Sequence, residues 1–432
     1  MALNDKLFHR ELYVEHLEEG AFQYATRIAW LTDEEVGWQD LERLEYAIEA
    51  HLDGLVVGGE EALNVCLEML PDAEFDLLFI IALLFCRLRS SSGLAALWQN
   101  FDFDDEQKVR AVSDAFLWEC PTKWRLHISK VFESGKIGLF PVLAPILARL
   151  QISVGPAYLR GLRQIKANFL PAMLAPLPLL PDAMEVLPGL QQLIGDPDHY
   201  IAGAAILASL RLGQRSVLAR CRAEPQFFPL HLVVAGELDE ARRILVVAET
   251  GNANADCLFA LGLWGNPGVV PVLLRYLPHE TYGAAAAQAL HLITGAPLFE
   301  TVRDPGQVTE DELFEHELED FRQGRLPAMF AGDEIEKLSQ DPARWQEWLT
   351  NNAAHFQAGQ RYRLGEPATP AVMVQQLIDN RTPNHIRQWV YLELVLRYGL
   401  GIHFDPHDQV ARQRQSLQAI YQWLNSSGAS HH

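Results

Sequence analysis

Two stretches of small residues, Tyr200-Ile-Ala-Gly-Ala-Ala-Ile-Leu-Ala-Ser-Leu-Arg-Leu-Gly213 and Tyr282-Gly-Ala-Ala-Ala-Ala-Gln-Ala-Leu-His-Leu-Ile-Thr-Gly295, align without gaps. Each begins at a tyrosine, carries an alanine pair and ends at a glycine, the residue that suits the position just after a helix. Small side chains let paired helices approach closely, as the layers of a stacked repeat must in order to share a core. The sequence therefore predicts a repeated helical unit.

The spacing of these stretches indicates the class of repeat. They begin 82 residues apart, about twice the roughly 40-residue period of HEAT or armadillo units. Between them, Asn266 and Pro267 have the pattern of a helix start, a capping side chain followed by proline. Asp196-Pro197 begins another unit in the same manner. We therefore expect an all-α fold, a HEAT-like α-solenoid of stacked helix pairs with an additional C-terminal helical region.

Helical spacing also dominates the N-terminal part. Apolar residues recur every three or four positions from Leu41 to Leu55, which predicts a helix capped by Asp40 and ended by Gly54. A second helix is expected from Glu60 to Leu70, after the pair Gly58-Gly59. Sustained alternation of apolar and polar residues, which would indicate strands, is hard to find anywhere.

Changes in composition divide the chain into five expected regions. An N-terminal helical region with degenerate repeats covers 1–170, and clearer HEAT-like repeats cover 171–299. An acidic insert covers 300–341 and a C-terminal helical region covers 342–425. The small, polar tail at 426–432 is expected to be disordered.

Net charge is the strongest feature of the composition. The chain has 432 residues, and 56 acidic against 35 basic residues give a net charge of −21. Such a protein repels nucleic acid and anionic membranes, because affinity for both comes largely from Lys and Arg. It attracts basic partners and can speed their association by roughly 10–10³-fold. The alternative is that acidity merely keeps the protein in solution.

Cysteine usage and apolar runs point to the cytoplasm. The cysteines form an odd set without a C-x-x-C pair, which favours free buried thiols in a reducing compartment. The charged stretch 1–20 lacks the apolar core of a signal peptide. The most apolar run, Leu77 to Cys86, is about half of the roughly 20 residues needed to span a bilayer. The five cysteines are Cys66, Cys86, Cys120, Cys221 and Cys257.

Signatures of catalysis, cofactor binding and metal binding fail on inspection. His316-Glu317 begins like the zinc motif H-E-x-x-H, but the last position is Asp320. Gly135-Lys136 lacks the preceding glycine of a phosphate-binding loop. Side chains at alternate positions of Glu49-Ala-His51-Leu-Asp53 point in different directions on a helix, so a structural role is favoured over metal binding. We predict a protein that is not an enzyme and uses no cofactor or metal.

An acidic helix in the insert is the candidate binding site. Thr309-x-x-Glu312 has the capping-box pattern that opens a helix. The clustered charges form either a solvated face or a docking surface for a basic partner. Trp345 and Trp348 leave a similar choice between core packing and an interface anchor. The candidate partner-binding residues are Glu310, Asp311, Glu312, Glu315, Glu319 and Asp320.

Three motifs carry a family resemblance. Glu11-Leu-Tyr-Val-Glu-His-Leu-Glu-Glu19, Glu49-Ala-His-Leu-Asp-Gly-Leu-Val-Val-Gly-Gly59 and Gly359-Gln-Arg-Tyr-Arg-Leu-Gly365 resemble a family of HEAT-like proteins from Gram-negative bacteria. Members are typically encoded beside type VI secretion effector genes, and the resemblance covers nearly the whole chain. It implies a genomic role and transfers no catalytic residues.

The resemblance implies one of two roles. An immunity protein binds and blocks a toxin that sister cells inject, whereas an adaptor or chaperone holds an effector for loading. An acidic surface matches a basic nuclease toxin, which favours immunity, with a cognate secreted effector as the partner. HEAT-like repeats also occur in bacterial DNA glycosylases, but those enzymes line a concave surface with Lys and Arg, which are scattered here. Reversing Glu312, Glu315 and Glu319 to Lys is expected to slow association.

Overall fold

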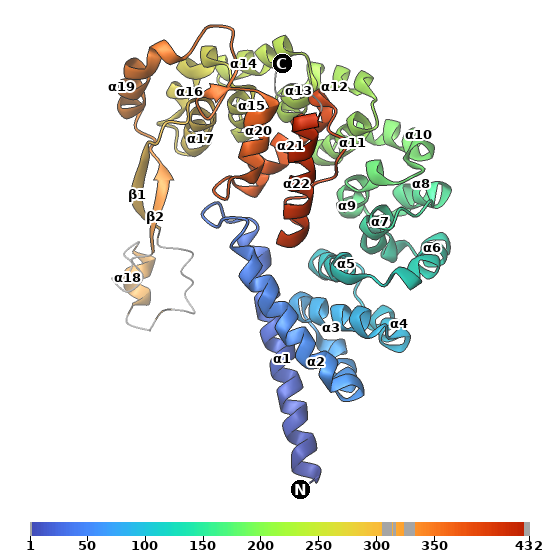
Figure 1. Ribbon diagram of the computed structural model, residues 1–432. Coiled ribbons are helices and arrows are strands. Elements are labelled where there is room, and N and C mark those ends of the chain that lie inside the picture. Colours follow the sequence, from blue (N-terminus) through green and yellow to red (C-terminus); the bar gives the residue numbers. More distant parts are fainter. Residues whose placement is uncertain (1, 305–312, 314–316, 324–332, 427–432) are drawn as a thin grey trace. The chain divides into compact units, whose positions relative to one another are not determined.

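The computed structural model describes residues 2–304, 313, 317–323 and 333–426 (Figure 1). The chain forms two compact units, one made of Met1–Ala223 and Met373–His432 and the other of Glu224–Val372. The described residues are mostly helical, which confirms the predicted helical fold at that level. The division after Ala223 falls inside the region 171–299, and the five regions expected from composition stay predictions.

The first unit contains helices from both ends of the chain. Its N-terminal part begins with two long helices and continues as shorter ones, and its C-terminal part returns to them. The helices are α1 (Ala2–Trp30), α2 (Leu41–Met69), α3 (Phe75–Leu88), α4 (Ser91–Asn100), α5 (Glu106–Glu119), α6 (Arg125–Glu133), α7 (Phe140–Arg149), α8 (Gly155–Gln164), α9 (Leu170–Leu174), α10 (Ala183–Ile194), α11 (His199–Arg211), α12 (Leu218–Ala223), α20 (Pro370–Ile378, which begins at the unit boundary), α21 (Asn384–Tyr398) and α22 (Val410–Ser426).

Helices two apart in sequence pack together in this unit. α3 packs on α5, α5 on α7, α7 on α9 and α9 on α11. In Figure 1 these helices follow one another, with α4, α6, α8 and α10 between them in the chain. Each layer therefore buries its apolar face against the next, as the spacing of apolar residues predicts.

α3 lies at the centre of the helices around it. All nine residues of Leu78–Cys86 are buried, because α1, α2 and α5 pack against α3. A helix that is apolar on every side is a core helix when protein surrounds it, which accounts for the most apolar run in the sequence. Within the described residues, no helix is both long and apolar enough to cross a membrane.

One expectation about the glycines of α2 is wrong and another is confirmed. The helix passes through Gly54 without ending, whereas Gly59, with the non-helical angles φ 54° and ψ −120°, separates two helical segments by a kink, as expected after Gly58-Gly59. Gly54 instead faces His16 of α1, where a Cβ atom would lie 2.6 Å from the imidazole Nε2. The glycine permits close packing of two helices rather than helix termination. Asp40 stands at the start of α2, but its side chain makes no capping hydrogen bond there.

The described residues of the second unit form short helices and four short strands. Its first five helices also pack two apart, with α13 on α15 and α15 on α17. The elements are α13 (Pro229–Ala235), α14 (Arg242–Glu249), α15 (Ala255–Trp264), α16 (Val270–Tyr276), α17 (Gly283–Thr294), β1 (Phe299–Asp304), α18 (Leu318–Arg322), β2 (Asp333–Leu338), α19 (Pro342–Asn352), β3 (Tyr362–Arg363) and β4 (Glu366–Pro367).

Capping side chains fix where several helical segments begin. The side chain of Asn266 accepts a backbone hydrogen bond at 2.8 Å, and Pro267 follows it, as predicted. The start expected at Asp196-Pro197 is displaced by two residues, because Asp198 provides the capping carboxylate of α11. Trp345 is fully buried and its indole N–H donates to Ser339 O at 2.7 Å, so Trp345 belongs to the core.

The strands were not predicted from the sequence. β1 and β2 are antiparallel, with Phe299 opposite Leu338 and Asp304 opposite Asp333. These six-residue strands bracket part of the acidic insert, so the insert is not purely helical at its ends. β3 and β4 form a second, two-residue pairing.

Candidate functional site

Most of the predicted binding residues lie outside the described part of the chain. These are Glu310, Asp311, Glu312 and Glu315. The other two, Glu319 and Asp320, are exposed in the first turn of the short helix α18. The expected docking helix in the insert thus stays a prediction.

The net charge is confined to two segments. Residues 1–70 hold 16 acidic and 4 basic residues, a net charge of −12, and residues 300–341 hold 13 and 4, a net charge of −9. The remaining residues hold 27 of each and are neutral. A search for runs of acidic residues finds only the second segment. The first is missed because its charges are dispersed over two amphipathic helices, although a count of charge by segment finds it.

One face of α1 combines these acidic side chains with exposed apolar ones. Its members recur every three or four positions, which places them on one side of a helix. Phe8 and Phe22 are each 63% exposed and lie about 21 Å apart along the helix axis at 1.5 Å per residue. We call this face the α1 stripe, and all its residues are exposed: Phe8, Glu11, Leu12, Glu15, Glu18, Glu19 and Phe22.

The opposite face of α1 is fixed in the core. The ring of Tyr24 stacks on Phe79 of α3 with centroids 3.8 Å apart, and its hydroxyl donates to Asp114 Oδ2 at 2.9 Å. Burial raises the pKa of both Tyr24 and Asp114, so the phenol stays a hydrogen-bond donor at neutral pH. The α1 stripe is therefore presented on a helix whose other side is anchored.

The first two resemblance motifs meet between α1 and α2. His16 Nδ1 and His51 Nδ1 lie 3.1 Å apart, so one imidazole donates to the other. Burial, and next the proximity of His16, lowers the pKa of His51, while Glu19 and Glu15 oppose this effect. Elsewhere along α2, a Cβ atom on Gly58 would lie 2.5 Å from the ring of Tyr13. These motifs thus determine helix packing.

The third resemblance motif closes the ends of two helices in the second unit. The Arg361 guanidinium donates to Trp264 O at 2.7 Å, at the end of α15. The backbone N–H of Leu364 donates to Leu292 O at 2.7 Å, near the end of α17. Carbonyls in the last turn of a helix lack intrahelical donors and carry partial negative charge, which these groups satisfy. The motif Gly359–Gly365 therefore has a structural role.

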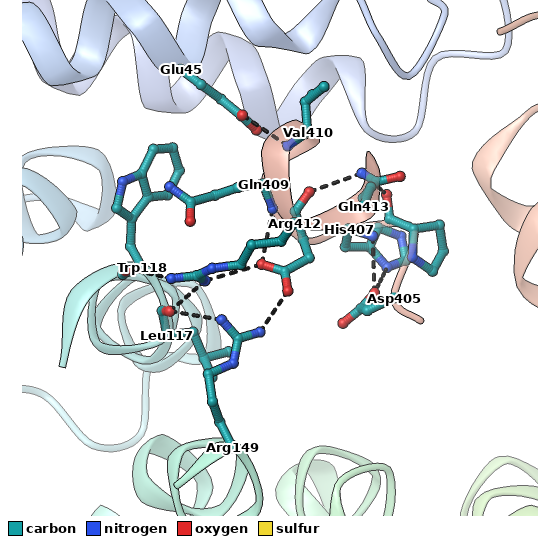
Figure 2. A network of polar contacts seen from close by, with 12 residues as sticks. Glu45, Leu117, Trp118, Arg149, Asp405, His407, Gln409, Val410, Arg412 and Gln413 are labelled. Atoms are coloured by element: carbon teal, nitrogen blue, oxygen red, sulfur yellow. Dashed lines mark hydrogen bonds and ion pairs between the residues drawn. The ribbon is translucent and has the colours of Figure 1, made fainter. Parts of the chain in front are cut away.

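A polar network joins α22 and the residues before it to α5 and α7 (Figure 2). Arg149 Nη2 donates to Asp408 Oδ2 at 2.7 Å, and Arg412 Nη1 donates to Asp408 Oδ1 at 3.2 Å. Arg412 also donates to the carbonyls of Leu117 and Trp118 at 2.7 and 2.6 Å. These carbonyls lie at the C-terminal end of α5, where positive charge is favourable.

A buried ion pair completes the attachment of α22. Arg27 and Glu45 are 4% and 7% exposed, and Arg27 Nε donates to Glu45 Oε1 at 3.0 Å. The other carboxylate oxygen of Glu45 accepts the N–H of Val410, the first residue of α22, at 2.9 Å (Figure 2). Burial raises the pKa of Glu45, which the Arg27 guanidinium opposes. These contacts hold the start of α22 against α1 and α2 and leave no carboxylate oxygen of Glu45 for a ligand.

A cavity of about 250 Å³ belongs to the same network. Its lining includes Leu117, Arg149 and Arg412. Arg149 Nη1 donates to Leu117 O at 2.9 Å, and both guanidinium groups also form the bonds described above. Cys120 also lines it, and burial raises the pKa of this thiol to about 12, which leaves it protonated and unreactive at neutral pH. The cavity is a gap between the side chains of the structural network, and its lining shows no group prepared for catalysis.

The cysteines and potential metal ligands give no sign of a reaction centre. Within the described residues, none of the five cysteines is joined in a disulfide. Burial raises the pKa of Cys66 to about 12, as it does for Cys120. Across the described ranges, no group of three or more His, Cys, Asp or Glu side chains is placed to hold a metal ion.

Comparison with known proteins adds no family. No protein-family model, no curated protein and no solved structure matches the chain. The α1 stripe combines exposed apolar side chains with part of the segregated acidic charge.

Proposed function

We propose that this chain is an immunity protein, which binds a cognate type VI secretion toxin in the cytoplasm and neutralises it stoichiometrically without catalysis. The observation that carries the proposal is the confinement of the net charge of −21 to residues 1–70 and 300–341. A charge that only maintained solubility would have no reason to be concentrated. Concentrated acidic segments attract and orient a partner of opposite charge.

The α1 stripe supports a role in protein binding rather than a role in solubility alone. Interfaces combine apolar and aromatic anchors with a polar surround, and here Phe8, Leu12 and Phe22 alternate with glutamates. Each exposed ring offers a face to an arginine guanidinium, as Trp30 already does to Arg43 of the same chain at 4.4 Å. A partner with basic and apolar residues on one surface matches the stripe.

A nuclease toxin is the partner class that fits the charge. A protein that binds nucleic acid contacts phosphates through Lys and Arg, so its active surface is basic. An acidic inhibitor competes for that surface. The resemblance to proteins encoded beside type VI secretion effector genes supports a secreted effector as the source of the toxin.

The proposed fold is a HEAT-like α-solenoid. It is supported by the packing of alternate helices, α3 to α11 in one unit and α13 to α17 in the other, and by the capped turn at Asn266-Pro267. In such an array each unit contacts only its neighbours, which leaves an extended surface for a macromolecular partner.

Co-expression of this chain with the product of the adjacent effector gene tests the proposal. We expect rescue from killing and co-purification of the two chains as a stable complex. The matched control is the same chain paired with an effector from an unrelated gene cluster, which should still kill. A stable complex without rescue would replace immunity with the adaptor role, and the absence of a complex would refute both.

A further inference from the structure

Two histidines face each other across the contact between α1 and α2. His16 Nδ1 lies 3.1 Å from His51 Nδ1, and the two rings meet edge to face with centroids 5.4 Å apart. A hydrogen bond between two imidazole nitrogens requires an N–H on one ring and a free lone pair on the other. The contact can therefore form when both rings are neutral or when one of them is protonated. It cannot form when both are protonated, because each Nδ1 then carries a hydrogen.

Each ring packs against a glycine of the opposite helix. The His16 ring lies against Gly54 of α2, where a Cβ atom would come within 2.6 Å of the imidazole Nε2. His51 lies beside Gly20 of α1, where a Cβ atom would be 3.7 Å from the His51 Cβ. The same Cβ atom would be 3.0 Å from the side chain of Ile80, which α3 contributes on this side. Repulsion between the two rings therefore acts directly on the contact between the helices.

Four carboxylates lie near the pair on the two helices. They are Glu15 and Glu19 of α1 and Glu49 and Asp53 of α2. The first two favour protonation of His51, whereas Arg87 of α3 pairs with the other two. Carboxylates ordinarily titrate at about pH 4 and imidazoles at about pH 6.5. Between these values the two imidazoles are therefore the groups of this cluster that change charge.

We propose that the His16–His51 pair makes the attachment of α1 to α2 sensitive to pH. While at most one of the two imidazoles is protonated, one ring donates to the other and the helices stay in contact. When both are protonated, two N–H groups and two positive charges oppose each other at hydrogen-bond distance, and the contact breaks. Acidification therefore loosens the helix that presents the α1 stripe. The inference goes beyond the proposed function and does not depend on it.

The direction of the effect follows from the pKa of His51. Burial, and next the proximity of His16, lowers this pKa in the folded chain, although Glu19 and Glu15 oppose the effect. When α1 is detached or the chain is unfolded, a histidine titrates near its ordinary value of about 6.5. Those states therefore bind protons more readily than the packed state does. The contact contributes fully above about pH 6.5 and weakens as the pH falls below this value.

Hydrogen exchange of the backbone amides of α1, followed by mass spectrometry of the full chain, tests the proposal. The protection of these amides is compared at about pH 7.5 and pH 5, after correction for the intrinsic dependence of exchange on pH. Protection is expected to fall roughly 10-fold or more in the unmodified chain, because two like charges at this separation repel by at least that factor near a protein surface.

Two glutamine variants show whether the pair causes the loss. In His51→Gln the amide can still bond to His16 but does not titrate, so protection of α1 should change by less than about 2-fold over the same range. The matched control is His127→Gln, at an exposed histidine of α6, which should lose protection as the unmodified chain does. Constant protection in the unmodified chain would overturn the proposal. An equal loss in the unmodified chain and in His51→Gln would also overturn it.

A further variant keeps the proposal testable if His51→Gln does not fold at neutral pH. The double variant Glu15→Gln/Glu19→Gln changes only exposed side chains and removes the charges that raise the pKa of His51. A lower pKa means that the second proton binds at lower pH, so the midpoint for loss of α1 protection should move to lower pH than in the unmodified chain. An unchanged midpoint would refute the role of the pair.

Discussion

Replacing Glu45 by alanine is expected to lower the free energy of unfolding by about 3–5 kcal/mol, the usual cost of removing one member of a buried ion pair. The substitution leaves the Arg27 guanidinium buried without its carboxylate and removes the acceptor of the Val410 N–H at the start of α22. Urea denaturation monitored by tryptophan fluorescence, at pH 7 for both proteins, measures the difference.

The matched control for Glu45→Ala is Glu68→Ala. Glu68 pairs with Arg10 at 3.2 Å, but both side chains are at least half exposed, so the loss should stay below about 1 kcal/mol. A double variant in which Arg27 becomes Met and Glu45 becomes Leu is expected to recover much of the lost stability, because it leaves no unpaired buried charge. Equal, small losses for Glu45→Ala and Glu68→Ala would contradict the importance of the buried pair.

Substitution of Gly265 by alanine is expected to destabilise the second unit by more than 2 kcal/mol. Gly265 follows α15 with φ 74°, a left-handed conformation that costs other residues roughly 1–2 kcal/mol. A Cβ atom there would also lie 2.1 Å from Tyr362 O, and the Tyr362 N–H donates to Gly265 O at 2.7 Å. Neither backbone can move without breaking that bond, so the clash adds to the conformational cost.

Gly251→Ala is the control for Gly265→Ala. Gly251 has φ 78° and lies in the same unit, but no atom lies within 4 Å of the position its Cβ would take. Gly251→Ala should therefore show the conformational cost alone, roughly 1–2 kcal/mol. Chemical denaturation followed by circular dichroism compares the two, and equal losses would show that the approach of Tyr362 carries no energetic weight.

The helices could be predicted because their signals are local. The pair Asn266-Pro267 is enough to predict a helix start, and a helical turn begins there in the structure. Gly54 could not be interpreted in the same way, because a glycine marks either a helix end or a close approach, and only the position of His16 distinguishes them. The pairing of β1 with β2 joins segments about thirty residues apart, which no short pattern specifies.

The candidate site was predictable in its charge and not in its geometry. Segment charges can be counted from the sequence, and the α1 stripe follows once α1 is recognised as a helix. The contact between Glu45 and Val410 spans 365 positions, and the contact between His16 and His51 spans 35. Such combinations depend on the tertiary fold, which local spacing does not determine.

The most direct test of the account measures association rates with the purified adjacent effector by stopped-flow fluorescence, at low and high salt. Three triple variants carry the same change of charge. One reverses Glu11, Glu15 and Glu18 to Lys in the α1 stripe, and one reverses Glu312, Glu315 and Glu319 in the insert. The control reverses exposed glutamates of the neutral part of the chain: Glu133, Glu249 and Glu347.

If the concentrated charge steers association, the stripe and insert variants should associate about 10-fold or more slowly than the unmodified chain at low salt. Their association rates should also depend less on the salt concentration. The control variant should keep nearly the unmodified rate. Equal rates for all four proteins would show that electrostatic steering plays no part in binding. Equal slowing of all three variants would show that total charge matters and its placement does not, which would contradict the central claim.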